Sequence, residues 1–385
     1  MTIEPSNHVA YETRAYLDDK LVAVSSLALQ SELPDATPVL YFPEADVREK
    51  LPHLRELLVP SAPRGYVGFD PKHARVRQVI VDGLPGEAER DQTIKRFPVW
   101  GDAKHLIDML NVRPAEDGNF VSVTRDNTAN RHRGVVEGSQ MLAQSIVAAG
   151  RRAPGRRVVK ASMLFMRAAN THEPLRVQLE ELSGGRNFTS LAAHVRQAGK
   201  LCASGILLLD ATAPDVMRHS VAAPETQGPY DSTPYDMSVT GRDIRFVDDA
   251  YTGDPNAPVG PPIIDAWVRY REVPQDPYLH AGLLAHFTGH VSIAAAMRAH
   301  AGIGQAQAHR SLSTAINAIT ISFHADVRAD QWLLYRHHST FAGDGMTHSE
   351  CRVHDQAGRL LASFSVEAMV RSMASDRPVD ARTAL

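Results

Sequence analysis

The chain has 385 residues, of which 43% are hydrophobic and 22% charged, and its formal net charge is −3. This length predicts two or three domains with material for buried cores, and the charge balance gives no global signal for a nucleic-acid partner. The two cysteines, Cys202 and Cys351, lack the spacing of a metal site, so we expect a reducing compartment.

No targeting or membrane segment is expected. The N-terminal residues Met1 to Leu21 have no apolar core of the kind that a secretory signal needs. No apolar run approaches the roughly 20 residues that cross a bilayer. We therefore expect a cytoplasmic protein with no membrane partner.

In chain order, residues 1–100 come first and contain short β-rich runs broken by proline and glycine. These runs are Leu21–Leu29, Pro38–Phe42 and Val76–Val81. They predict a small β-rich N-terminal domain.

Two longer blocks follow, at residues 101–213 and 262–373, and residues 374–385 form a tail. Residues 214–261 between the blocks are rich in Pro, Asp, Gly and Thr. Such a stretch has too little apolar surface for a core of its own, so we expect a linker that packs on the surface.

The two blocks repeat one pattern. Gln197-Ala-Gly-Lys-Leu-Cys-Ala-Ser resembles Gln356-Ala-Gly-Arg-Leu-Leu-Ala-Ser, 159 residues later. Ser162-Met-Leu-Phe-Met-Arg lies over Thr320-Ile-Ser-Phe-His-Ala at an offset of 158, and the stretch from Gly138 lies over that from Gly289 near an offset of 151. Agreement in order, spacing and element type indicates an internal repeat.

Each repeat predicts one helix followed by several strands. The helix that starts at Gly138 is apolar around most of its circumference, which is typical of a buried helix. Strands are expected at 158–167, 175–182, 188–197 and 200–209, and the Gln-Ala-Gly segments fit hairpin turns because glycine accepts positive φ. One buried helix wrapped by a long antiparallel sheet is the hotdog arrangement. We expect an α+β fold with a tandem (double) hotdog whose two sheets lie side by side.

Several motifs in residues 101–373 resemble the acyl-CoA thioesterase II family, which has a double hotdog. The first repeat carries Leu106-Ile-Asp-Met-Leu-Asn and Gly138-Ser-Gln. The second carries Gln307-Ala-His-Arg-Ser-Leu-Ser-Thr, Ser322-Phe-His-Ala, Gln331-Trp-Leu-Leu-Tyr and Leu361-Ala-Ser-Phe-Ser-Val-Glu-Ala-Met-Val-Arg. The resemblance implies that an acyl-CoA, or another acyl thioester, is hydrolysed to a free acid and CoA without a cofactor. Homo-oligomerisation stays open.

The chain departs from this family at its catalytic positions. The family uses an Asp at the start of the second helix, a Ser or Thr on the next strand and a Gln on the last strand. The motifs place Gly289, Ile316 and Val366 at these positions.

Nearby polar residues are therefore the catalytic candidates. His290 is the preferred general base, since its ordinary pKa lies near neutrality; the alternative is a partly exposed helix-start histidine. Asn317 can orient a water, or be an ordinary polar residue on an exposed strand face. Glu367 lies within an apolar strand and is either catalytic or an interface carboxylate. Thr314 lies two residues before Ile316 and so faces the same side of the strand.

Substrate-binding candidates lie at helix starts and in one glycine-rich turn. We expect Gly289 to supply backbone N–H groups to an oxyanion, with tight packing as the alternative. Gln140 can hold the carbonyl or make a helix-start hydrogen bond. Gly343, Asp344 and Gly345 can let a pantetheine arm approach the backbone.

No metal site is expected, because no His/Cys or His/carboxylate spacing matches one among the histidines considered. These histidines are His337, His338, His348 and His354.

Three functions are weighed. The first is an acyl-CoA thioesterase. The second is a hotdog that binds an acyl thioester, or serves a specialised biosynthetic pathway, without the usual trio. A hydratase ranks last, since no Asp/His pair opens either helix. Residues 38–51 resemble a small all-β family of unknown function, and the N-terminal domain can cap an acyl pocket, recognise a carrier or build an oligomer.

Overall fold

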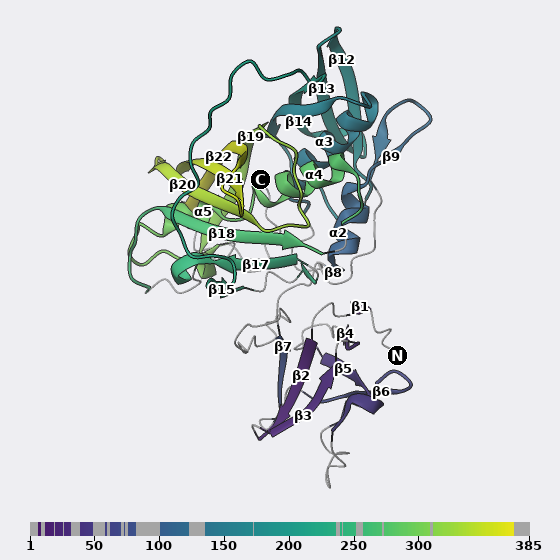
Figure 1. Cartoon of the computed structure of the whole chain (residues 1–385), viewed down its shortest axis with the longest axis vertical. Helices are drawn as coiled ribbons and strands as arrows, with labels where there is room; N and C mark the ends of the chain where they lie inside the picture. Colours follow the sequence, from purple (N-terminus) through teal and green to yellow (C-terminus); the bar gives the residue numbers. More distant parts are fainter. Residues whose placement is uncertain are drawn as a thin grey trace. The chain divides into compact units, whose positions relative to one another are not determined.

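The computed structural model describes residues 7–8, 12–18, 20–25, 27–31, 39–48, 58–59, 62–70, 73, 76–81, 101–122, 135–171, 173–235, 239–240, 242–251, 257–271, 273–308 and 311–372. The chain divides into two compact units (Figure 1). The first comprises residues 1–106, 128–132 and 234–243, and the second comprises 107–127, 133–233 and 244–385. None of the described helices is both long and apolar enough to span a membrane.

In the described residues, the N-terminal part of the first unit consists mainly of β-strands. Its described strands are β1 (Asn7–His8), β2 (Glu12–Leu17), β3 (Lys20–Ser25), β4 (Leu29–Ser31), β5 (Val39–Pro43), β6 (Tyr66–Gly68) and β7 (Val76–Val81). They form a sheet in the order β1-β4-β5-β6 and a sheet in the order β3-β2-β7. Ala15, Val22, Leu40, Phe42 and Phe69 lie at its core. The expectation of small β-rich structure here is confirmed.

The second unit is built on one long sheet. In the described residues this sheet has 13 strands, in the order β15-β17-β18-β20-β21-β22-β19-β11-β14-β13-β12-β10-β9. The first repeat supplies β9 (Arg113–Pro114), β10 (Phe120–Val121), β11 (Arg157–Phe165), β12 (Arg176–Gly184), β13 (Phe188–Gln197) and β14 (Lys200–Asp210). The second supplies β18 (Ile263–Tyr270), β19 (Leu312–Phe323), β20 (Leu333–Gly343), β21 (Met346–Asp355) and β22 (Leu360–Ser372). The long antiparallel sheet predicted for each repeat is confirmed.

The two repeats meet at the pairing of β11 with β19. These strands run antiparallel, from Lys160 opposite Ser322 to Leu164 opposite Ala318. Ser162 faces Thr320, and their hydroxyl oxygens are 2.7 Å apart. These two residues are equivalent in the sequence repeat, so each repeat presents the same residue position to the other. The seam therefore lies on a local two-fold axis, as expected for two hotdogs whose sheets lie side by side.

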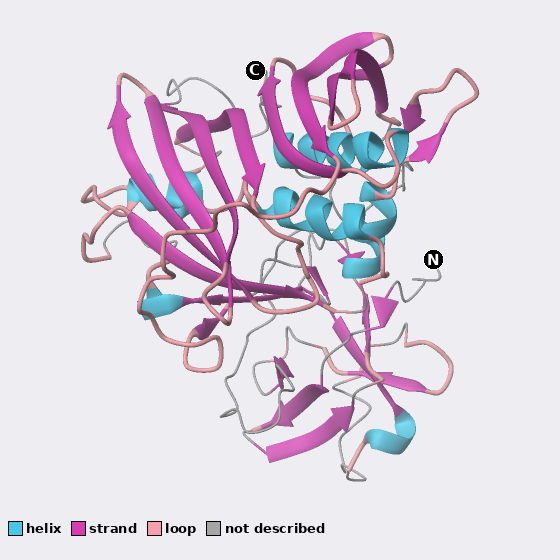
Figure 2. Ribbon diagram, turned by 45° about the horizontal axis from the view of Figure 1, so that its top comes forward, coloured by secondary structure: helices cyan, strands magenta, loops and turns pink. Residues whose placement is uncertain are grey.

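Two helices pack against each other beside this sheet (Figure 2). They are α3 (Gly138–Arg152) and α4 (Pro277–Phe287). A Cβ added to Gly150 would collide with the Tyr278 ring, and one on Gly282 would lie 2.9 Å from Val147. The later residue of α3, Gly150, meets the earlier residue of α4, Tyr278, while Val147 meets Gly282, so the two helices pack antiparallel. Glycines permit the close approach.

The helix predicted to begin at Gly289 is shorter than expected, begins at Ser292 and is not the counterpart of α3. The counterpart of α3 is α4, which ends at Phe287, and the next helix, α5 (Ser292–Met297), begins after Gly289. The overlooked signal is Asp276-Pro277. Asp276 accepts hydrogen bonds from the Tyr278 and Leu279 N–H groups, and proline at the first helical position is favourable.

The segment expected to be a surface linker also contributes to the sheet. It supplies β15 (Thr233–Pro234) and β17 (Arg242–Phe246), and all five residues of β17 are buried. The Arg245 guanidinium lies 5.7 Å from the centre of the Trp332 ring. The strand is not recognisable in the sequence because it contains charged residues, and their burial depends on partners that are distant in the chain.

The remaining described elements are short. They are β8 (Gly101–Asp102), β16 (Val239–Thr240), α2 (Ala103–Leu110), and the single-turn 3₁₀ helices Glu44–Asp46, Val247–Asp249 and Gln305–Gln307.

Both Gln-Ala-Gly segments are hairpin turns, as predicted. The first joins β13 to β14 through Ala198 and Gly199, with φ of 46° and 77°. The second joins β21 to β22, and Gly358 has φ of 80°.

Candidate functional site

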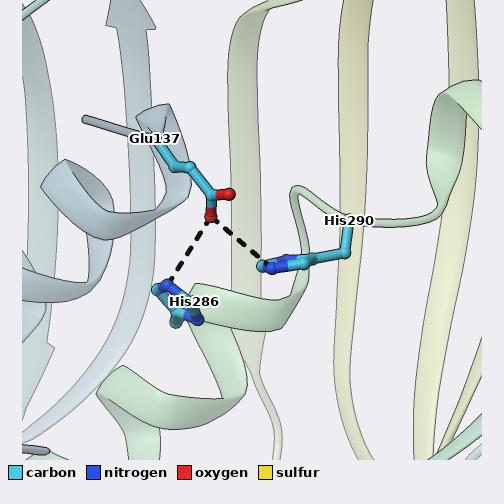
Figure 3. A group of neighbouring side chains, drawn as sticks. All are labelled: Glu137, His286 and His290. Atoms are coloured by element: carbon cyan, nitrogen blue, oxygen red, sulfur yellow. Dashed lines mark ion pairs between the residues drawn. The ribbon is translucent and has the colours of Figure 1, made fainter. Parts of the chain in front are cut away.

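Three ionisable side chains meet where the start of α3 faces the end of α4 (Figure 3). The Glu137 Oε2 atom lies 3.7 Å from His286 Nε2 and 3.5 Å from His290 Nε2. The side chains are 20%, 2% and 12% exposed, in that order. The group joins the two repeats, since Glu137 belongs to the first and both histidines belong to the second.

Local backbone structure explains how the histidines converge. His286 lies in the last turn of α4. The chain continues in a turn beyond it, where the Thr288 N–H donates to the Ala285 carbonyl and the His290 N–H donates to that of Phe287. The His290 ring stacks on Phe287, with centroids 5.0 Å apart and planes 7° from parallel. His290 thus stands one turn beyond His286, on the same side.

Glu137 is the residue immediately before the first turn of α3. It has extended backbone angles, φ −67° and ψ 142°, and its side chain makes no capping hydrogen bond to the helix. The carboxylate is therefore directed to α4. The positive end of the α3 dipole favours a carboxylate there, and the negative end of the α4 dipole favours positive charge on the histidines.

The family's catalytic positions carry no polar side chains here, and Gly289 directly precedes His290. A Cβ on Gly289 would lie 2.7 Å from Ser139 Oγ and 3.1 Å from Ile316 Cδ1. Val366 is 1% exposed on the buried face of the sheet. Gly289 and Ile316 therefore lie side by side, and a larger side chain at Gly289 would require Ser139 and Ile316 to shift.

Two buried amide oxygens, on residues expected at the site, have no hydrogen-bond partner among the described residues. One is Oε1 of Gln140, three residues after Glu137. The other is Oδ1 of Asn317, which forms a β-bulge between Ile316 and Ala318 in the β19–β22 pairing. Buried acceptors of this kind call for a ligand or water as donor.

The predicted catalytic residues Thr314 and Glu367 lie on opposite faces of the sheet. Thr314 is buried opposite Val370 and shares the inner face of β19 with Ile316, as expected from its spacing. Glu367 is on the outer face of β22, where its Oε1 lies 3.3 Å from His348 Nδ1 and its side chain is 40% exposed. The structure does not bring Glu367 to His290, because side chains alternate along a strand.

The glycine-rich segment Gly343-Asp344-Gly345 is the tight turn between β20 and β21. Asp344 and Gly345 have φ of 53° and 73°, the conformation of a two-residue hairpin turn. The Val370 N–H donates to the Gly345 carbonyl, so the turn lies at the end of β22 that also holds Ala368, opposite Ile316. This chain geometry accounts for the glycine at 345 without a ligand.

A second polar group is fully enclosed in the second repeat. Ser292 Oγ lies 3.0 Å from His337 Nδ1, and Cys351 Sγ lies 3.5 Å from the same nitrogen. Burial lowers the pKa of His337 to about 3 and raises the pKa of the Cys351 thiol to about 12. These shifts oppose both a protonated imidazole and a thiolate, so this group is a weaker candidate site than the Glu137 cluster.

Glu137 and His286 were missed from the sequence. One signal was present, since His286 and His290 are four residues apart, the spacing that places two side chains on one helix face. Glu137 could not be paired with them, because it comes from the other repeat.

Comparison with known families assigns the two repeats. The model of the acyl-CoA thioesterase N-terminal domain matches residues 128–209, and that of the acyl-CoA thioesterase C-terminal domain matches residues 219–370. Together they account for more than half of the chain. No curated protein matches the sequence.

Solved structures show the same fold. The tesB protein of Mycobacterium avium subspecies paratuberculosis matches with a TM-score of 0.58 and 20% identity, over 70% of this chain and 99% of that one. An acyl-CoA thioesterase II from Mycobacterium marinum matches with a TM-score of 0.58 and 24% identity, over 69% and 98%. A hot dog fold protein of unknown function from Alicyclobacillus acidocaldarius has a TM-score of 0.55 and 15% identity, over 69% and 98%.

Proposed function

Because the chain belongs to the acyl-CoA thioesterase family, we propose that it hydrolyses an acyl-CoA thioester to a free acid and CoA. We place the chemistry at Glu137, His286 and His290. The observation that carries this assignment is the meeting of these side chains beside Gly289, the position where the family has its catalytic Asp.

Hydrolysis requires a water that attacks the thioester carbonyl and a group that receives its proton. Two imidazoles and a carboxylate around one point can orient that water, and histidine exchanges protons near neutral pH. The attack creates an oxyanion and then expels CoA as a thiolate, which is protonated on release. The acyl group keeps the oxygen of the attacking water and is released as the free acid.

The start of α3 can stabilise the oxyanion. The first N–H groups of a helix have no partner within it, and those of Gly138 and Ser139 open α3 directly after Glu137. A Cβ on Gly138 would lie 2.9 Å from the Phe165 ring, so this residue must be small. Gly138, rather than Gly289, therefore takes the helix-start role.

The unpartnered oxygens of Gln140 and Asn317 suit the pantetheine arm, because its amide N–H groups are donors. The turn Gly343-Asp344-Gly345 remains a proposed contact for the same arm. Arg151 at the end of α3 and Arg157 at the start of β11 are weak candidates for the CoA phosphates, since they are paired with Asp276 and Asp210.

The function is tested with the full chain and a panel of acyl-CoAs from acetyl to stearoyl, with released CoA measured through its thiol. The proposal predicts turnover that saturates with at least one substrate. The absence of CoA release above the rate without protein, for every member of the panel, would refute hydrolysis.

A second function is favoured by one observation. The family's carboxylate is absent at Gly289, which packs against Ser139 and Ile316. A chain that has lost hydrolysis would still bind an acyl thioester. Binding of a non-hydrolysable acyl-CoA thioether, together with no CoA release from the matching thioester, would establish this alternative.

A further inference from the structure

The separations within the Glu137 cluster are too long for direct hydrogen bonds. A charge-assisted N–H···O⁻ bond is about 2.7–2.9 Å long. The carboxylate oxygen instead lies 3.7 and 3.5 Å from the two imidazole nitrogens. The carboxylate and the two imidazoles are thus at ion-pair distance but longer than a short hydrogen bond.

These separations match the ligands of a tetrahedral metal ion. Zinc lies about 2.0–2.1 Å from histidine nitrogen and carboxylate oxygen, so two of its ligands are about 3.3–3.4 Å apart. The two measured distances exceed this by a few tenths of an ångström. All three ligand atoms lie within 4.8 Å of one another.

The donor set and its spacing favour the same ion. Two imidazoles and one carboxylate are ligands that zinc takes in catalytic sites, where a fourth position stays open. His286 and His290 are four residues apart, the spacing of paired zinc-binding histidines, although His290 lies in the turn that follows α4 and not in the helix itself. The stacking of His290 on Phe287 holds one ligand in place before an ion arrives.

We propose that Glu137, His286 and His290 bind one divalent transition-metal ion, with zinc the best match to the donor set. Ion binding itself does not depend on the proposed function; its catalytic consequence does. In catalysis, His290 would then be a metal ligand and not the general base. The ion would lower the pKa of a water at its open position so that the water can attack the thioester.

The test begins with the full chain stripped by a chelator and dialysed against zinc. We expect one zinc per chain by elemental analysis, and a visible absorption band when cobalt(II) replaces zinc. Glu137→Gln, which is nearly isosteric, and His290→Gln should each weaken zinc binding at least tenfold.

The matched control is His348→Gln, since His348 also lies beside a glutamate, on the outer face of the sheet. It should bind zinc like wild type. Circular dichroism of every variant checks that it is folded. Wild-type chain that retains no zinc, or a Glu137→Gln variant that binds zinc as tightly as wild type, would overturn the inference.

CoA release measured on the same samples separates the two proposals. If zinc binds but neither the stripped nor the loaded chain releases CoA, the metal site stands and the proposed function fails. If the stripped chain is as active as the loaded one, the catalytic consequence of the ion is wrong and hydrolysis proceeds by proton transfer.

Discussion

Glu137 connects the two repeats at the scale of a single side chain. Its carboxylate leaves the start of its own helix uncapped and faces two histidines from the other repeat. The sequence singles out His290 because it follows Gly289, the residue at the family's catalytic position, and His290 lies in the Glu137 cluster. The sequence cannot supply Glu137, since the contact joins residues roughly 150 positions apart and only the fold creates it.

The first prediction concerns this carboxylate. Glu137→Gln keeps the shape of the side chain but removes its charge, so kcat for CoA release should fall by about 100-fold or more. KM should change little, because the acyl-CoA binding groups remain. Steady-state kinetics against the His348→Gln control tests this, and a kcat equal to that of the control would exclude Glu137 from the chemistry.

His337 gives a prediction on pH. Burial lowers its pKa from 6.5 to about 3, so the folded chain holds it neutral while the unfolded chain protonates it below 6.5. This contribution to stability is complete above pH 6.5 and is lost as the pH falls toward 3. The loss between pH 7 and pH 5 is about 2 kcal/mol.

Urea unfolding of wild type and His337→Gln at both pH values isolates that contribution. Other histidines titrate in both proteins, so only the difference between them is informative. The pH-dependent loss should be smaller in the variant by about 2 kcal/mol. Equal losses in both proteins would show that His337 is not held neutral.

At the scale of elements, α3 and α4 fit together through small residues. Periodicity in the sequence predicts α3 from Gly138 with its buried surface, but it shifts the second helix to Gly289. The cap and proline of α4, Asp276-Pro277, define its start better than apolar spacing does. β17 was not predicted because three of its five residues are charged, although all five are buried.

The helix contact predicts a measurable coupling. A Cβ on Gly282 would lie 2.9 Å from Val147, so Gly282→Ala should destabilise the fold by about 1–3 kcal/mol. Val147→Ala creates space for the added methyl group. The double variant should therefore lose less stability than the sum of the two single variants, by at least about 0.5 kcal/mol in urea unfolding. Additive losses would mean that the helices are farther apart.

At the scale of the whole molecule, the repeat was the most informative sequence feature. It predicted the tandem hotdog, and its 158-residue offset joins Ser162 to Thr320, which face each other at the seam. The offset says nothing about side chains that only one repeat carries. The scaffold was therefore predictable while the polar cluster, which is asymmetric, was not.

The continuous sheet predicts the behaviour of the seam. Amides in the β11–β19 pairing, from Lys160 to Leu164 and from Ala318 to Ser322, should exchange with deuterium as slowly as those paired within one repeat. Hydrogen exchange with peptide-level mass spectrometry measures this. Much faster exchange at the seam than in the β13–β14 pairing would indicate that the repeats open independently.

The most direct test of the proposed site is a crystal structure of the chain with a non-hydrolysable acyl-CoA thioether. The account predicts that the carbon replacing the thioester carbonyl lies near the Glu137 carboxylate and the His290 ring, with space for one water between them, within about 4 Å of the start of α3. A thioether that instead lies at Glu367 and His348, or far from α3, would contradict the account.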